Sequence, residues 1–262
     1  MRPDCVRRFW SQRLDALATE LARGRRRHRT TQDLTRKTTH VHREGRHVID
    51  IAREIDAIHR QVSRQSAADG DSIRILLRRR YDAAPKDVWS ALTEPDRIRR
   101  WFVPLSGDLR AGGNFQLEGN AGGEILRCEP PHLLRVTFGS ETSVVELRLS
   151  SEGDVGTVLE LEHTVPIEMA QNGAGALYVG PGWDGALLGL GLYLDGKVSD
   201  DPVAAASSPE AQGFSGRSVH AWAAVISASG TATDDEIAAA AEVSLKQFAP
   251  DLAAQDPGSS DA

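Results

Sequence analysis

The chain has 262 residues, enough for one domain with extensions or for two small domains. Hydrophobic residues make up 40% of it, but no run of about 18 apolar residues occurs, so we expect no membrane-spanning helix. The N-terminal arginines are not followed by an apolar stretch, which argues against a secretory signal. Two widely separated cysteines, Cys5 and Cys128, fit a reducing cytoplasm.

Charge divides the chain near residue 47. Residues 1–47 carry a net charge of +8, and the remainder carries −14. The basic segment has few aliphatic residues after Gly24, so we predict that it is disordered. Its Arg25 to Arg29 run could bind nucleic acid, but we expect no such partner, because a start at Val48 would make residues 1–47 an artefact of gene assignment.

An amphipathic helix is predicted for residues 48–65. Ile51, Ile55, Ile58 and Val62 recur at the spacing of a helical apolar stripe. The stripe could cover the next domain or pair with a second copy, so a homodimer is one hypothesis. Residues 66–72 are predicted to be a linker.

Strand periodicity begins at Ser72. Residues 72–81 alternate apolar and basic side chains, and two short helices with early prolines follow over 83–92 and 94–102. Five further strands are predicted over residues 114–119, 122–129, 132–138, 143–150 and 157–165. Glycine-containing turns between them indicate an antiparallel sheet.

A glycine-rich helix is predicted from about Pro181 to Gly196. Trp183, Leu187, Leu190 and Leu194 form a continuous apolar stripe on it. Each interior glycine costs about 1 kcal/mol relative to alanine, so packing must support this helix. The concave face of a bent sheet would provide that support.

Residues 72–196 resemble the START-like SRPBCC superfamily. The runs RRRYDAAPKDVWSALTEPDRIRRWF, GDLRAGGNFQLEGNAGGEILRCEPPHLLRVTF, GTVLELEHTV and GPGWDGALLGLGLYL carry the resemblance. They are most similar to homologues of the C-terminal domain of the activator of heat-shock-protein-90 ATPase. The resemblance implies an α+β helix-grip fold, in which a curved antiparallel sheet surrounds a long helix and leaves an apolar cavity. Residues 1–71 are too short and too basic to replace the activator's chaperone-binding domain.

A ligand site in that cavity is predicted from strand parity and from the resemblance. Leu159, Leu161, His163 and Val165 share one strand face, so His163 points inward. It could contact a ligand or act as an acid or base, or it could be a core histidine with satisfied nitrogens. The candidate ligand contacts are Trp101, Phe115, Phe138, His163, Tyr178, Trp183 and Leu187.

Other motifs are set aside. Gly180 to Gly185 matches the pattern of a dinucleotide-binding turn, but no βαβ unit surrounds it. His40, His42 and His47 lack the context of a metal site, so no metal or cofactor is predicted. Residues 197–213 resemble a flexible linker, after which helices are predicted over 214–229 and 233–249, with modest packing, before a frayed tail over 251–262.

Three functions remain open. We favour binding of a hydrophobic small molecule, because no catalytic set of acid, base and nucleophile is evident. A cyclase, dehydratase or hydrolase using the cavity is the first alternative. A protein-interaction or co-chaperone-like module is the second.

Overall fold

The structure is a computed structural model that describes residues 49–67, 70–197, 199 and 201–254. The expected disorder of the basic segment, the three histidines at 40–47 and residues 255–262 of the predicted tail lie outside these residues. The start of that tail is not frayed, because residues 251–253 belong to the short helix Pro250–Ala253. The described residues belong to one compact unit.

Eight antiparallel strands form one curved sheet in the order β1-β2-β8-β7-β6-β5-β4-β3. The last six strands in the chain follow two helices and precede the long helix, as the resemblance implied. The strands are β1 (Ile58–Ala67), β2 (Gly70–Tyr81), β3 (Leu105–Gly107), β4 (Asn114–Leu117), β5 (Gly122–Glu129), β6 (Leu133–Thr137), β7 (Val144–Glu152) and β8 (Gly156–Pro166).

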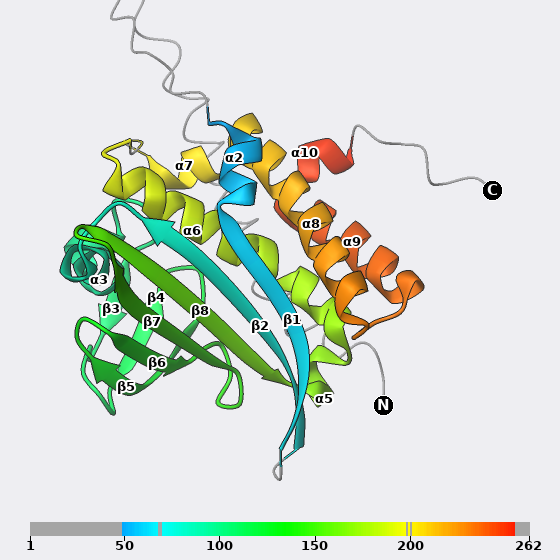
Figure 1. The fold of residues 1–262 in the computed structure, drawn as a ribbon, viewed down its shortest axis with the longest axis horizontal. Coiled ribbons are helices and arrows are strands. Elements are labelled where there is room, and N and C mark those ends of the chain that lie inside the picture. Colours follow the sequence, from blue (N-terminus) through cyan, green and yellow to red (C-terminus); the bar gives the residue numbers. More distant parts are fainter. Residues whose placement is uncertain (1–48, 68–69, 198, 200, 255–262) are drawn as a thin grey trace, which may run out of the picture. The chain divides into compact units, whose positions relative to one another are not determined.

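In the described part of the chain, helices precede and follow the strands and also lie between them. Figure 1 shows α6 against the sheet, with α8 and α9 beyond β1. The helices are α2 (Ile51–Asp56), α3 (Pro85–Thr93), α4 (Pro95–Ile98), α5 (Ile167–Ala170), the 3-10 helix η1 (Gly173–Tyr178), α6 (Gly180–Leu194), α7 (Pro202–Ala206), α8 (Pro209–Ser229), α9 (Asp234–Phe248) and α10 (Pro250–Ala253).

The long helix α6 packs on the inner face of the sheet. The Tyr81 hydroxyl of β2 donates a hydrogen bond to the Leu187 carbonyl of α6 at 2.9 Å. Gly191 faces the side chains of Arg79 and Tyr81, and Gly189 faces Trp101. Glycine at these two positions therefore lets α6 pack closely against β2 and the residues after α4. This close packing compensates for the low helix propensity of glycine. The helix-grip fold expected from the sequence is confirmed.

The prediction of one helix over residues 48–65 is wrong. Only α2 is helical there, and β1 pairs along its whole length with β2 from Ile58↔Arg79 to Ala67↔Gly70. Ile58 and Val62, four residues apart, share a face in a strand as well as in a helix, so their spacing did not distinguish the two. The predicted linker at 66–72 accordingly belongs to a β-hairpin, although residues 68 and 69 lie outside the described part.

The C-terminal helices contribute more to the core than expected. Phe214, Trp222 and Ile226 of α8 are fully buried and belong to the same apolar core as β1, β2, β8 and α6. The predicted capping box of α9 is present, with Thr233 as the N-cap and Glu236 as its partner. Part of the predicted linker at 197–213 is helical, since α7 lies within it and α8 begins at Pro209.

Candidate aromatic site and a buried charged cluster

Alternation along β2 and β8 creates the apolar surface beneath α6. Ile75 pairs with His163 and Leu77 with Leu161, so these four side chains share a face. All four are buried. His163 therefore points inward, in agreement with the parity of its strand.

Four ring side chains from different elements meet at this surface, and we call them the aromatic cluster: Phe115, Phe138, His163 and Trp183. Phe138 lies just after β6 and is central, with ring centroids 6.4 Å from Phe115, 6.0 Å from His163 and 5.0 Å from Trp183. The separations are those of favourable aromatic pairs. Phe115, Phe138 and Trp183 are only half-buried, whereas His163 is 1% exposed.

Both ring nitrogens of His163 have partners. The Trp183 indole donates from Nε1 to His163 Nδ1 at 3.1 Å, and Ser143 Oγ lies 2.8 Å from His163 Nε2. Because an indole only donates, Nδ1 must be the unprotonated nitrogen, and a neutral ring then carries its proton on Nε2. Burial lowers the pKa of His163 from 6.5 to about 4, so the ring is neutral at pH 7.

This tautomer is unsuited to activating Ser143 as a nucleophile. A general base would need a free lone pair on Nε2 to take the hydroxyl proton, and an acidic partner at Nδ1 to stabilise the resulting cation. Here Nε2 carries the proton and Nδ1 accepts a hydrogen bond. The pair therefore resembles a satisfied core histidine more than the start of a hydrolytic triad.

The other three predicted ligand contacts lie elsewhere on or around α6. The Trp101 indole donates to the Ala91 carbonyl at 3.0 Å and stacks on Phe102. Leu187 is buried, one turn after Trp183, and Tyr178 is half-buried in η1. Four of the seven predicted residues thus form one cluster, and the remaining three are separate core positions.

Comparison with known proteins identifies the family. The family model of the Activator of Hsp90 ATPase homolog 1-like protein matches residues 82–195. The crystal structure of CalU16 from Micromonospora echinospora is 45% identical, and the match covers 65% of this chain and 98% of CalU16 with a TM-score of 0.54. The chain belongs to the Activator of Hsp90 ATPase homolog 1-like family.

Two further structures are similar. The solution structure of CalU16 is 43% identical, with 66% of this chain and 97% of CalU16 covered and a TM-score of 0.56. An HSP90 activator from Plasmodium falciparum is 23% identical over 34% of this chain and 71% of its own, with a TM-score of 0.32. The search among curated proteins gave no match.

A buried charged cluster lies on the other side of α6 and was not predicted from the sequence. Asp184, fully buried, accepts at Oδ2 from Arg60 Nε at 2.8 Å, from the Ser218 hydroxyl and from Trp222 Nε1 at 3.1 Å. We call Arg60, Asp184, Ser218 and Trp222 the Asp184 cluster. It joins β1, α6 and α8, and two of these three elements lie outside the residues that the family model of the Activator of Hsp90 ATPase homolog 1-like protein matches.

Desolvation dominates the electrostatics of this cluster. Burial raises the pKa of Asp184 above its usual value, and Arg60, Ser218 and Trp222 act in the opposite direction. Arg60 Nη1 also donates to the Ile55 and Ile58 carbonyls, at the junction of α2 and β1. Arg60 Nη2 and Asp184 Oδ1 stay buried without a partner. An unpaired donor and an unpaired acceptor of this kind are the groups to which a buried water molecule binds.

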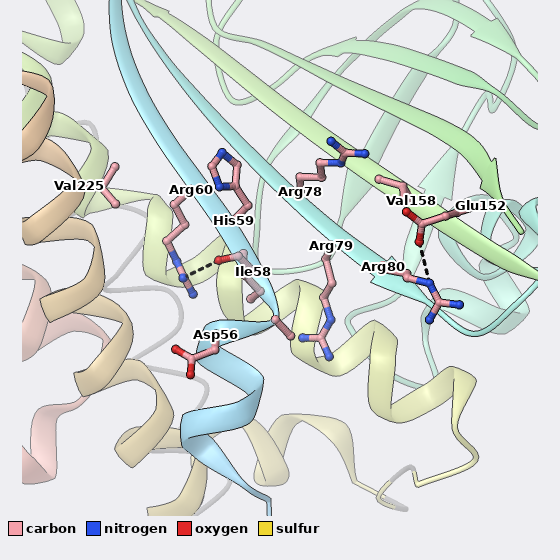
Figure 2. Close-up of a pocket in the computed structure, with 11 residues that line it drawn as sticks. Asp56, Ile58, His59, Arg60, Arg78, Arg79, Arg80, Glu152, Val158 and Val225 are labelled. Atoms are coloured by element: carbon pink, nitrogen blue, oxygen red, sulfur yellow. Dashed lines mark hydrogen bonds and ion pairs between the residues drawn. The ribbon is translucent and has the colours of Figure 1, made fainter.

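A groove of about 500 Å³ lies at the same end of β1 and β2. Figure 2 shows Arg60 and Arg79 on one side of these strands and Arg78 directed away from them. None of the seven predicted contacts lines this groove. Its residues are Asp56, Ala57, Ile58, His59, Arg60, Arg78, Arg79, Arg80, Glu152, Val158 and Val225.

The arginines of the groove are already neutralised. Arg60 pairs with Asp184, Arg79 with Glu54, Arg78 with Glu160, and Arg80 with Asp82 and Glu152. The groove therefore has no surplus positive charge to attract an anion. Within the described ranges, no three His, Cys, Asp or Glu side chains gather as metal ligands, and no helix is long and apolar enough to cross a membrane.

Proposed function

We propose that this protein binds an apolar, ring-containing small molecule at the aromatic cluster, between α6 and the sheet. The observation that carries the proposal is that Phe115, Phe138 and Trp183 meet face to face or at a tilt and still keep part of their surface exposed. Large aromatic side chains at a partly open position supply the apolar contact that such a ligand requires.

The support around the cluster favours a preorganised site. Trp183 is held by its hydrogen bond to His163, and Phe138 is packed between Trp183 and Phe115. Rings that are fixed before binding lose little conformational entropy when a ligand arrives. A binding role also suits His163, whose hydrogen bonds orient the indole.

Equilibrium dialysis with fluorene, a planar tricyclic hydrocarbon, tests this function. The wild-type protein should bind fluorene, and Trp183→Ala should weaken binding at least about tenfold by removing one wall of the site. The matched control is Phe248→Ala, because Phe248 of α9 lies against Gly182 on a neighbouring part of α6 but outside the aromatic cluster.

Native mass spectrometry of the protein from its own cells provides the second measurement. A co-purified apolar molecule that Trp183→Ala loses and Phe248→Ala retains would support the proposal. The proposal fails if the wild type neither binds fluorene nor carries such a molecule, or if the two variants bind fluorene equally.

A further inference from the structure

Three side chains form a hydrogen-bonded chain that starts on α6 and ends at the turn between β6 and β7. Trp183 Nε1 donates to His163 Nδ1, and His163 Nε2 contacts Ser143 Oγ at 2.8 Å. The order fixes the direction of every bond, because the indole at one end can only donate. His163 must then donate from Nε2, and Ser143 must accept.

Accepting this bond leaves the Ser143 hydroxyl with its own hydrogen to donate. Ser143 is 4% exposed, so water has little access to that hydrogen. Within the residues that the structure describes, the hydroxyl meets no acceptor, since its one side-chain partner is His163. A buried donor without an acceptor carries a free-energy cost that a suitable ligand would remove.

Ser143 is linked to the aromatic cluster by two hydrogen bonds. The Phe138 amide donates to the Ser143 carbonyl at 2.8 Å, so the serine is tied to the residue at the centre of that cluster. His163, its hydroxyl partner, meets Phe138 and Trp183 edge-on. The Ser143 hydroxyl is thus one hydrogen bond away from a ring that packs against two members of the aromatic cluster.

We propose that Ser143 donates a hydrogen bond to an oxygen of the ligand, so that the site selects flat apolar molecules carrying a carbonyl or similar acceptor. This inference rests on the proposed function and adds the chemical class of the ligand. In an otherwise apolar site, the few polar groups orient a small molecule and determine the specificity of binding. A ligand lacking the acceptor would leave the buried hydroxyl unpaired.

A matched pair of probes tests the selection. Fluorene and 9-fluorenone have the same planar tricyclic frame and differ by one carbonyl oxygen. In equilibrium dialysis we expect the wild type to bind 9-fluorenone about fivefold more tightly, the effect of one hydrogen bond. Ser143→Ala should lose this preference while still binding fluorene.

Two further variants complete the test. Thr142→Val removes the neighbouring, exposed hydroxyl of the same turn and should keep the preference. Ser143→Cys keeps the shape of the side chain but has a weaker donor, so it should reduce the preference for 9-fluorenone. It takes the place of Ser143→Ala in the test if circular dichroism shows that Ser143→Ala does not fold.

The outcomes separate this inference from the proposed function. Equal binding of both probes by the wild type, an undiminished preference in a folded Ser143→Cys, or any remaining preference in a folded Ser143→Ala would overturn the role of Ser143 alone. Failure of the wild type to bind either probe would overturn this inference, and it would contradict the proposed function as well if no apolar molecule co-purifies with the protein.

Discussion

Trp183 and Asp184 are neighbours in α6, yet they enter two very different polar environments. Trp183 joins a neutral chain in which both ring nitrogens of His163 have partners. Asp184 enters an ionic cluster in which one carboxylate oxygen takes three donors and the other has no partner. The neutral side avoids the large desolvation cost of a buried charge, whereas the ionic side must offset that cost with several bonds.

The largest expected effect comes from breaking the ionic side. Asp184→Ala should lower the free energy of unfolding by about 3–5 kcal/mol, because it leaves the Arg60 guanidinium buried without its counter-charge. Urea denaturation measures this loss. Arg64→Met is the control on the same strand. It removes an exposed ion pair with Asp71 and should cost no more than about 1 kcal/mol.

A double variant sharpens the same point. Arg60→Met combined with Asp184→Leu should be less destabilised than the sum of its single changes by about 1–3 kcal/mol, since neither charge is left alone. Strict additivity in urea would show that the two side chains do not interact energetically, contrary to their 2.8 Å contact.

The neutral side should respond to pH. The pKa of His163 falls from 6.5 to about 4 on burial, so between these values the unfolded chain binds more protons than the folded one. Stability from this group is present above pH 6.5 and is lost as pH falls towards 4. Between pH 7.5 and 5 the loss is about 2 kcal/mol.

The variant His163→Gln isolates this contribution. Its amide can accept from Trp183 and donate to Ser143 without titrating. Urea midpoints compared at pH 7.5 and 5 should therefore move less in His163→Gln than in the wild type. Equal shifts in both proteins would contradict a buried, neutral His163.

Overpacking at the start of α6, beside the Asp184 cluster, should destabilise the protein about as much as the pH change does, or less. A Cβ at Gly180 would overlap the buried indole of Trp222, which donates to Asp184. Gly180→Ala should therefore lower the free energy of unfolding by about 1–3 kcal/mol. Thermal unfolding measures it, and a rise in the melting temperature would refute the close approach of α6 to α8.

The smallest effect has the opposite sign. A Cβ at Gly185 would meet nothing within 4 Å, and this position is in the middle of α6. Gly185→Ala should raise the free energy of unfolding by about 0.5–1 kcal/mol, because alanine restricts the unfolded chain and favours the helix. A loss of stability in the same thermal assay would mean that α6 needs glycine there for close packing.

Local pattern predicted much of this fold. The apolar stripe of Trp183, Leu187, Leu190 and Leu194 correctly located α6, and alternation correctly located six strands. The three-residue β3 was missed, because so short a strand carries no periodicity. β1 was predicted to be a helix because Ile51, Ile55, Ile58 and Val62 have the spacing of a helical stripe. The polar Arg60 between Ile58 and Val62 hides the apolar alternation that would indicate a strand.

The site could be predicted only in part, because its residues interact with partners far away in the sequence. Parity directed His163 inward, but its tautomer depends on Ser143 and Trp183, each 20 residues away. The Arg60–Asp184 pair joins positions 124 residues apart, and no local spacing predicts it. Only the folded chain shows that Arg60 points inward, opposite the direction of Arg78.

The Asp184 cluster affects where this protein can be truncated. Cutting the chain at the limits of the family match, residues 82–195, would discard Arg60, Ser218 and Trp222 together. The remaining helix would present a lone carboxylate and bare apolar surface where β1 and α8 had packed. The matched segment therefore lacks the partners that neutralise and cover its own helix, and both flanks should be kept with it when the protein is trimmed or its domains are exchanged.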